Sequence, residues 1–401
     1  MKSIIVTLIA VNSLLAALGI AQAQAQPPSY AVTDLGFVGI GQPYSITNNG
    51  IVGGGASSPD GTLRAALWYK GLKIKIGTPG LGGLNSIAFG VNERGQAVGE
   101  AETSTPDPNG EDFCGFKSLG ISLFNNTCSP FLWENGVMTP LPTLGGNNGV
   151  ANQINNRGEA AGGAENAARD NPGCPGPQVL QYKPATWEKG NIRELPTVAG
   201  DLDGLALAIN DKGQVVGASG ECAPFNEVNA FYLQPLHALL WQKGVVTDLG
   251  NLGGTGHGNG NLALDVNNQG NVVGYSDLKG DANFHAFLWT GDAGMQDLGT
   301  VPGDVSSLAV SINDAGEVVG ASLDASFNPR AFIRKGGVMI DLNTLIPSDS
   351  PFFLIVAPSI NSNGQIAALA AEKSAGQAHA VLLTPRCWNN ANAESCEDDT
   401  K

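Results

Sequence analysis

The sequence predicts an all-β fold, a seven-bladed β-propeller of four-stranded antiparallel meanders, from three observations. A block of the form Ile/Val-Asn-x-x-Gly followed by a short apolar run recurs seven times along the 401 residues, with Thr47 in place of the asparagine in the first copy. The chain holds 55 glycines and 23 prolines but only 14% charged residues, which is typical of many turns and few long helices. The two ends of the chain carry complementary parts of one repeat, which indicates a closed ring.

Each recurring block predicts a tight hairpin. Asparagine at the first turn position caps its own backbone, and glycine three residues later takes the positive φ that other residues resist. Short β-branched runs flank the turn on both sides, so each block is strand, turn, strand. The turn glycines stand at positions 50, 95, 158, 213, 270, 316 and 364.

A third and a fourth strand follow each block. The fourth strand ends in Asp-Leu-Gly or a relative, as in QDLG at 296–299. Each unit is therefore a four-stranded meander of 45 to 63 residues, the size of a propeller blade. The third strands are AALW at 65–68, PFLW at 130–133, PATW at 184–187, HALLW at 237–241, HAFLW at 285–289, RAFI at 330–333 and HAVLL at 379–383.

The seventh unit lacks a fourth strand of its own. It stops at HAVLLTP, whereas YAVTDLG, residues 30–36, precedes the first block and has the form of a fourth strand. We therefore expect the amino-terminal strand to complete the last blade, which would leave no exposed sheet edge between the first and the last unit.

The chain divides into three parts. Residues 1–25 read as a signal peptide, with Lys2, an apolar run and a small-residue cleavage site, so the mature protein is expected to be secreted, either periplasmic or extracellular. Residues 29–385 form the propeller, and 386–401 form an acidic, cysteine-containing tail. The seven units lie near 43–78, 86–144, 150–198, 205–250, 262–300, 307–345 and 353–385, with 30–36 as the closing strand.

The third-strand pattern resembles the bacterial extracellular repeat family named after its His-Ala-Phe tripeptide, the HAF repeats. His285-Ala286-Phe287 carries the tripeptide literally, and the resemblance covers roughly residues 30–385. Pro184 and Arg330 depart from it at the histidine position, and KIKIGT at 73–78 is a degenerate fourth strand. The resemblance implies a secreted repeat protein and no particular activity.

The histidines of the third strands are interpreted as structural. His285, Phe287 and Trp289 share one face of their strand, and Ala286 and Leu288 share the other. Both faces of a blade pack on neighbouring blades, which explains the apolar run. His237, His285 and His379 occupy equivalent positions in different blades and are too far apart to form one site.

Function is expected where one repeat differs from the others. From the glycine that ends the second strand to the third-strand tryptophan position, the spacings are 14, 34, 25, 24, 15, 14 and 15 residues. Units two, three and four thus carry insertions on the face of the blade-to-blade connections. In an exported chain the cysteines favour three disulfides, most simply Cys114–Cys128, Cys174–Cys222 and Cys387–Cys396, although six cysteines allow fifteen pairings.

Aromatic residues crowd the same insertions and are the candidate binding residues. A rival interpretation makes them a small hydrophobic core beneath the long loops. His257, in GGTGHGNGN, is the one histidine outside the repeat frame and joins the candidates, although a lone loop histidine is usually solvated. The candidates are Phe113, Phe116, Phe124, Tyr182, Phe225, Tyr232 and His257.

No catalytic set and no metal site is predicted. Asp201, Asp203 and Asp304 follow or precede glycines in a way that Ca²⁺ could use, but the other ligands of such a loop are missing and turn aspartates explain them equally well. No cofactor is expected. Asp265 is the one acidic side chain that the inner strands offer towards the channel.

These features favour an exported, monomeric binding or adhesion module whose ligand is a protein or a glycan. The alternative is an extracellular carbohydrate-active hydrolase or lyase on a propeller scaffold, and a passive surface-layer component is the third possibility. The net charge of −15 argues against a nucleic-acid partner. The amino-terminal apolar run lacks the flanks of a membrane anchor, so no membrane span is expected.

Overall fold

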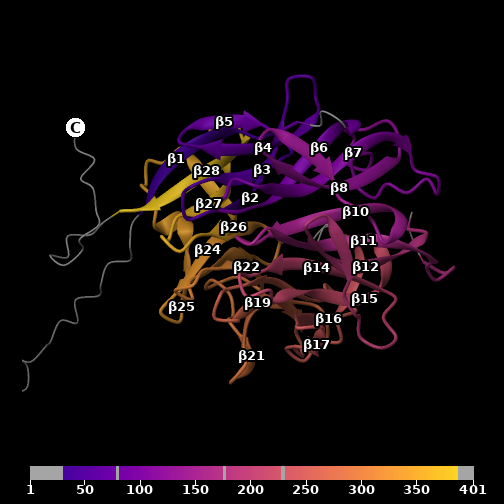
Figure 1. Cartoon of the computed structure of the whole chain (residues 1–401). Coiled ribbons are helices and arrows are strands. Elements are labelled where there is room, and N and C mark those ends of the chain that lie inside the picture. The colour runs from indigo at the N-terminus through magenta and orange to yellow at the C-terminus, as the bar shows by residue number, and fades with distance from the viewer. Residues whose placement is uncertain (1–29, 78–80, 175–177, 227–230, 387–401) are drawn as a thin grey trace, which may run out of the picture.

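Seven four-stranded antiparallel sheets form a closed ring, and the predicted seven-bladed β-propeller is confirmed. The computed structural model describes residues 30–77, 81–174, 178–226 and 231–386 (Figure 1). The predicted signal peptide and the cysteines Cys387 and Cys396 lie outside the described residues. Within them, no helix has the length and apolar character needed to cross a membrane.

Blades one to six run in chain order from an inner first strand to an outer fourth strand, and blade seven takes β1 as its fourth strand. Blades one to three contain β2 (Pro43–Ile46), β3 (Val52–Ser57), β4 (Leu63–Tyr69), β5 (Leu72–Lys75), β6 (Gly82–Val91), β7 (Ala97–Pro106), β8 (Asn126–Glu134), β9 (Val137–Pro140), β10 (Gly145–Ile154), β11 (Glu159–Arg169), β12 (Leu180–Glu188) and β13 (Asn191–Glu194). Blades four to seven contain β14 (Asp203–Ile209), β15 (Val215–Asn226), β16 (Phe231–Gln242), β17 (Val245–Asp248), β18 (Asn261–Val266), β19 (Val272–Asp277), β20 (Phe284–Thr290), β21 (Gly294–Asp297), β22 (Ser306–Ile312), β23 (Val318–Leu323), β24 (Pro329–Lys335), β25 (Val338–Asp341), the 3₁₀ turn η1 (Leu342–Thr344), β26 (Phe352–Ile360), β27 (Ile366–Glu372), β28 (Ala378–Pro385) and β1 (Tyr30–Phe37).

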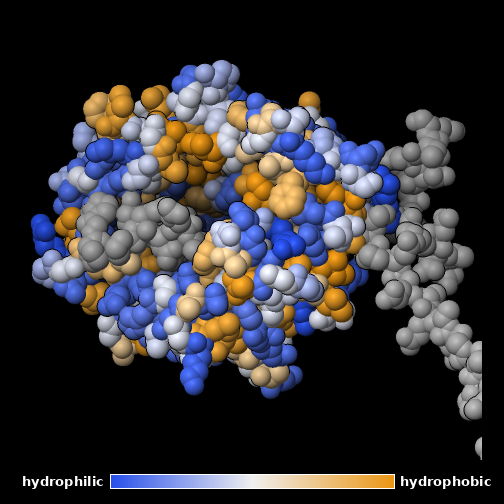
Figure 2. Space-filling model, turned by 180° about the vertical axis from the view of Figure 1, so that it is seen from behind, coloured by the Kyte–Doolittle hydropathy of each residue, from blue (hydrophilic) through white to orange (hydrophobic). Residues whose placement is uncertain are grey.

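The amino-terminal strand closes the ring as the sequence predicts. β1 pairs antiparallel with β28, from Tyr30 opposite Pro385 to Phe37 opposite His379. In Figure 1 the indigo start of the propeller lies beside its yellow end. The first strands contact one another in succession round the ring, so they surround its axis. Figure 2 shows one face of the molecule, hollowed near its centre, with hydrophobic residues along part of the rim of the hollow.

The hydrophobic core lies between the blades. Phe287 and Trp289 of β20 pack against blade four, whereas Ala286 and Leu288 of the same strand pack against blade six. The alternation of the two strand faces predicted for HAFLW is therefore observed. Because each sheet buries both faces, every blade depends on its two neighbours for its core.

The histidine of the His-Ala-Phe tripeptide binds the aspartate of Asp-Leu-Gly within the same blade. Nδ1 of His285 lies 2.9 Å from Oδ1 of Asp297, and Nδ1 of His379 lies 3.0 Å from Oδ1 of Asp34 across the seam that closes the ring. Arg330 stands at the histidine position of blade six, and its guanidinium lies 3.7 Å from Asp341. These two positions of the repeat thus join the third and fourth strands in blades five, six and seven, whereas His237 of blade four contacts Asp201 instead.

The asparagine that begins the turn in blades two to seven also joins neighbouring blades. The Asn210 side-chain amide donates to the carbonyl of Asn267 at 2.8 Å, and its oxygen accepts from the backbone amides of Lys212 and Gln214. The same inter-blade bond recurs around the ring and ends with Asn361 donating to Thr47 of blade one at 2.9 Å. The full series of donors is Asn92, Asn155, Asn210, Asn267, Asn313 and Asn361. The predicted self-capping turn is thus also an inter-blade contact.

Candidate functional site in the inserted loops of blades two to four

The insertions lie on the face opposite the asparagine turns. They connect β7 to β8, β11 to β12 and β15 to β16, at the ends of the second strands where the blade-to-blade connections also run. For example, the amide of Leu144 in the connection before β10 donates to the carbonyl of Glu165 near the end of β11. We call residues 107–125, 170–174 and 178–180 the ridge; residues 175–177 and 227–230 lie outside the described residues.

Asp107 fixes the blade-two insertion both to itself and to blade three. Its Oδ1 accepts from the backbone amides of Asn109 and Glu111, at 2.8 and 3.0 Å, which closes the first turn of the loop. Its Oδ2 accepts at 2.8 Å from the side-chain amide of Asn148, a fully buried residue of β10. The carboxylate of Glu165 accepts hydrogen bonds from the same Asn148 side-chain amide and from the backbone amides of Asn147 and Asn148.

Glu111 joins the insertions of blades two and three. Its Oε1 accepts from the backbone amide of Val179 and, at 3.3 Å, from that of Leu180. Glu111 is only 2% exposed, so this contact lies under the loops. The amide groups of the blade-three insertion, which has no strand ladder there, thereby gain partners from the neighbouring blade.

Asp203 and a disulfide attach the blade-three insertion to blade four. Oδ1 of Asp203, in β14, accepts from the Tyr182 amide at 2.8 Å and from the Gln178 side chain at 3.0 Å. Cys174 is bonded to Cys222 of β15. The ridge is thus connected through polar contacts and a covalent bond across three adjacent blades.

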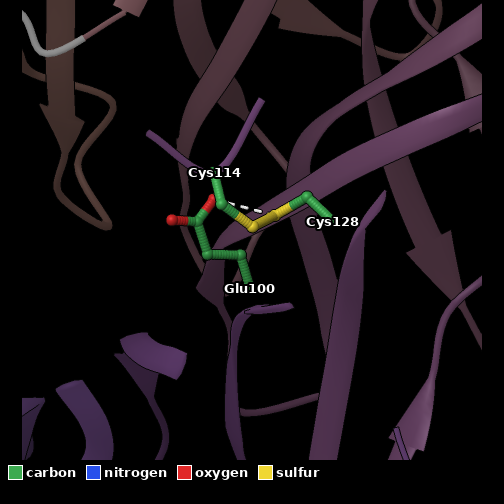
Figure 3. A group of neighbouring side chains, drawn as sticks. All are labelled: Glu100, Cys114 and Cys128. Carbon is green, nitrogen blue, oxygen red and sulfur yellow. Dashed lines mark hydrogen bonds between the residues drawn. A yellow bond between two sulfur atoms is a disulfide. The ribbon is translucent and has the colours of Figure 1, made fainter. Parts of the chain in front are cut away.

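Two of the three predicted disulfides, Cys114–Cys128 and Cys174–Cys222, are present. Figure 3 shows the carboxyl group of Glu100 bent towards the first of them, with its Oε2 3.6 Å from Sγ of Cys128. Burial raises the pKa of Glu100 to about 8, and the neighbouring charge of Asp112 adds to the shift. Because the sulfurs are bonded to each other, they are not thiolate ligands for a metal.

Other carboxyl groups beneath the ridge also have raised pKa values. Burial, with the nearby charge of Glu111, raises the pKa of Glu165 to about 8 despite its amide donors. Burial and the facing carboxyl of Asp170 raise the pKa of Asp203 to about 8. The oxygens of Glu165 and Asp203 accept from backbone amides near the starts of β10 and β12, so carboxyl groups with raised pKa values lie beneath the ridge and bind the strands that support it.

The structure separates the candidate aromatic residues into buried and exposed ones. Phe116 and Tyr182 are 1% and 7% exposed, and Phe113 packs edge-on against Tyr182 with ring centres 5.0 Å apart. Phe113 and Tyr182 belong to one apolar cluster, with Val150 and Leu205, and Phe116 belongs to another, with Leu63 and Ile87. Burial in these clusters removes Phe116 and Tyr182 from direct contact with a ligand. Phe124, in contrast, is 68% exposed. The side chains of Phe225 and Tyr232 lie outside the described residues.

Two aliphatic residues beside Phe124 were missed by the sequence reasoning. Leu119 and Leu123 are 53% and 85% exposed, so three large apolar side chains stand free within six residues of one loop. We call Leu119, Leu123 and Phe124 the ridge tip. The sequence does indicate these residues: they are three large apolar side chains in a loop otherwise rich in Gly, Ser and Asn, and they do not follow the alternation of a β-strand.

His257 and Asp265 do not come together. They lie at opposite ends of β18, and His257 contacts Thr255 of its own loop, with Nδ1 3.2 Å from the hydroxyl oxygen. The carboxylate of Asp265 accepts from the Ser311 hydroxyl at 2.9 Å and the Ile312 amide at 3.0 Å, so it links blade five to blade six. Its other oxygen accepts at 2.8 Å from the amide of Val266 in its own strand, so both oxygens of the acidic side chain that the inner strands were expected to offer towards the channel already have partners in the scaffold.

Two of the three aspartates considered for Ca²⁺ already face a basic side chain. Oδ2 of Asp201 lies 2.9 Å from Nδ1 of His237, and Oδ1 of Asp304 lies 2.5 Å from the Arg330 guanidinium. Both partners stand at the histidine position of the repeat, 36 and 26 residues further along the chain. These contacts disfavour a cation at either carboxylate. The aspartates of the Gly-Asp pattern instead bind the third strand of a blade and belong to the scaffold.

No protein-family model and no curated protein matches the sequence. Among solved structures, a puromycin-hydrolyzing peptidase of Mycobacterium tuberculosis is similar, with 11% identity over 88% of this chain and 55% of that chain and a TM-score of 0.46. Trypanosoma rangeli sialidase (9% identity, 89% and 54% coverage, TM-score 0.37) and a lectin of Burkholderia pseudomallei (11%, 90% and 98%, 0.35) are also similar. The chain spans about half the length of the peptidase and the sialidase. At these identities and TM-scores no functional conclusion follows.

Proposed function

We propose that the protein is an exported binding or adhesion module and that the ridge holds its ligand, a protein or a glycan. The observation that carries the proposal is the exposed ridge tip. Isolated apolar residues are ordinary on a protein surface, whereas a contiguous exposed group is typical of interaction sites. The signal-like amino terminus and the likeness to secreted HAF repeats support export.

The base of the tip is fixed in place, which suits a binding surface. Glu102, at the end of β7, accepts from the Ser122 hydroxyl at 2.6 Å and from the Asn126 side chain at 3.0 Å. The Cys114–Cys128 bond closes the same loop. A loop that is ordered before it meets a ligand loses less conformational entropy on binding, so more of the contact energy appears as affinity.

The rival function, a carbohydrate-active hydrolase or lyase, is favoured by one observation only. Carboxyl groups with raised pKa values, such as Glu165 and Asp203, are what an acid catalyst needs. However, both are 1% exposed, and they accept from the backbone amides of Asn148 in β10 and Tyr182 in β12. A catalytic carboxyl group must come within hydrogen-bond distance of its substrate, which this burial prevents.

The test compares two double variants of the mature protein. Leu123→Ser/Phe124→Ser removes the ridge tip, and Val137→Ser/Val245→Ser changes two side chains of similar exposure, 61% and 64%, on the opposite face. Binding is measured against a printed panel of uncharged polysaccharides and extracellular matrix proteins, with melting curves for each variant. We expect the tip variant to lose at least tenfold in affinity for the panel ligand that the unchanged protein binds, and the control variant to lose less than twofold.

Two results would overturn the proposal. One is full binding by the tip variant with an unchanged melting transition, which would place the ligand elsewhere. The other is turnover of a panel polysaccharide that is abolished by Glu165→Gln or Asp203→Asn in a folded protein, which would establish the hydrolase or lyase instead.

A further inference from the structure

A cation-lined groove lies between blades three and four, on the face of the short turns and away from the ridge. It has a volume of about 550 Å³, and its floor includes Trp187 and Trp241. Its walls come from the turns that begin and end the strands of the two blades. Five basic side chains line it: Arg157, Lys189, Arg193, Lys212 and Lys243.

The charge of this groove is opposite to that of the chain. The whole protein carries −15, with 21 basic residues, yet five of those basic residues meet here beside only two acidic ones, Glu159 and Glu188. Basic residues that gather in a concave site on an acidic protein raise the local concentration of anions and exclude cations. Such a concentration of one sign costs self-repulsion, so an anionic occupant would relieve it.

Three of the five cations have no acidic partner among the described residues. Arg157 pairs with Glu159, and Lys189 pairs with Glu188 at 3.1 Å. Arg193, Lys212 and Lys243 form no such ion pair in the described part of the chain. Their side chains are exposed and line one groove, so they can engage one ligand together.

We propose that this groove binds an anionic saccharide through its carboxylate or sulfate groups. The volume falls within the range of small-molecule sites and is too small for a nucleic-acid duplex. Trp187 and Trp241 are each only 2% exposed, so the floor offers no open aromatic anchor of the kind that protein partners use. Recognition therefore rests on charge, as suits a ligand that repeats an anionic group along a polar backbone.

This site is independent of the ridge. The ridge holds exposed apolar side chains at the ends of the second strands, whereas the groove is formed by basic residues at the opposite ends of the blades. A polysaccharide could in principle occupy the groove while another ligand contacts the ridge. The ridge-tip variant is accordingly expected to bind anionic saccharides as well as the unchanged protein does.

The test uses two lysine pairs that carry the same change of charge. Lys212→Gln/Lys243→Gln alters the groove, and Lys70→Gln/Lys279→Gln is the control. Lys70 and Lys243 occupy the same turn position in blades one and four, both with positive φ, which makes the pair closely matched. Affinities are measured by calorimetry at 50 and 200 mM salt for a sulfated hexasaccharide, an oligogalacturonate, a polyglutamate peptide and inorganic sulfate.

We expect the groove variant to bind at least one of the two saccharides fivefold or more weakly than the unchanged protein, and the control variant to stay within twofold. Affinity should fall about tenfold between the two salt concentrations, as for a ligand held by several ion contacts. The sulfated and the uronate arms then identify which anionic group is preferred.

Three outcomes would overturn the assignment. Equal losses in the groove and control variants would show that only net charge matters. Tighter binding of polyglutamate than of either saccharide would assign the groove to an acidic protein segment. Inorganic sulfate that binds as tightly as the hexasaccharide would show that the groove takes a single anion and recognises no saccharide.

Discussion

The two faces of this propeller are built by different means. On one face, the short turns repeat in every blade, and side-chain amides such as that of Asn210 join each turn to the next blade. On the other face, the ridge comes only from blades two and three, and it is held by individual carboxylates, such as Asp107 and Glu111, and by disulfides, one of which reaches blade four. The scaffold is therefore specified by residues that recur in every repeat, and the ridge by residues found only in the inserted loops.

The largest expected effect breaks the ring itself. Deleting residues 26–36 removes β1, leaves β28 with an unpaired edge and exposes the core around Leu354 and Val381 that Tyr30 covers. We expect aggregation or a fall in melting temperature of more than about 15 °C, because a blade loses a whole strand. Thermal melting and light scattering measure this. A truncated protein that melted like the mature one would refute closure by the amino terminus.

The next effect separates the ridge from the scaffold. Replacing Cys174 and Cys222 by alanine removes a bond that spans 48 residues. Disulfides closing loops of this size stabilise by about 3–4 kcal/mol in the chain-entropy description. We expect increased hydrogen exchange in the ridge and a lower melting temperature, while the turns of blades five and six keep their protection. Mass spectrometry after alkylation without reduction provides the covalent check, since labelling of two or more cysteines in the unchanged protein would contradict three native disulfides.

A smaller effect tests the turn face. Asn210 is 5% exposed, and its side chain takes part in four hydrogen bonds, two within its turn backbone, one to Gln214 and one to blade five. Asn210→Ala should cost about 2–3 kcal/mol, because it leaves buried backbone groups without partners. Asn251→Ala is the control, since this residue is exposed and caps only one amide in its connection. Similar denaturation midpoints for both variants would show that the Asn210 contacts do not stabilise the propeller.

The smallest effect concerns pH. The pKa of Glu100 is raised to about 8 from 4.5, so the folded state binds a proton that the unfolded state has already released. Its contribution is present below about pH 4.5 and is lost as the pH rises through about 8. The unchanged protein should therefore lose about 1 kcal/mol more stability between pH 7 and pH 8 than Glu100→Gln, measured by denaturant unfolding. Parallel pH curves for the two proteins would argue that Glu100 is ionised when folded.

The scaffold could be predicted because its evidence recurs. Seven similar blocks and one displaced fourth strand were enough for the blade number and the closure at 30–36. The bonds between blades could not be predicted in the same way. The sequence shows that Asn210 suits the start of a turn, but its partner, the carbonyl of Asn267, lies 57 residues away and can be located only in the folded ring.

The ridge shows where sequence reasoning stops. The disulfide pairs could be inferred from position, yet the partners of Glu111 and Asp107 lie in another blade, 68 and 41 residues away, with no period to relate them. For the same reason, the sequence alone left open a Ca²⁺ site at the turn aspartates. Asp201 looks like a loop ligand in isolation, and only the fold shows that His237 lies beside its carboxylate.

The central claim is that the ridge can be removed without loss of the propeller. The most direct measurement replaces residues 107–125 and 170–179 by the short loop of blade five, with the remaining partners Cys128 and Cys222 changed to serine. Melting curves and amide hydrogen exchange are then recorded. The account predicts one cooperative transition and unchanged protection of the Asn-x-x-Gly turns in blades five to seven. Loss of the cooperative transition, or unprotected turn amides in those blades, would contradict it, because the scaffold would then depend on the ridge.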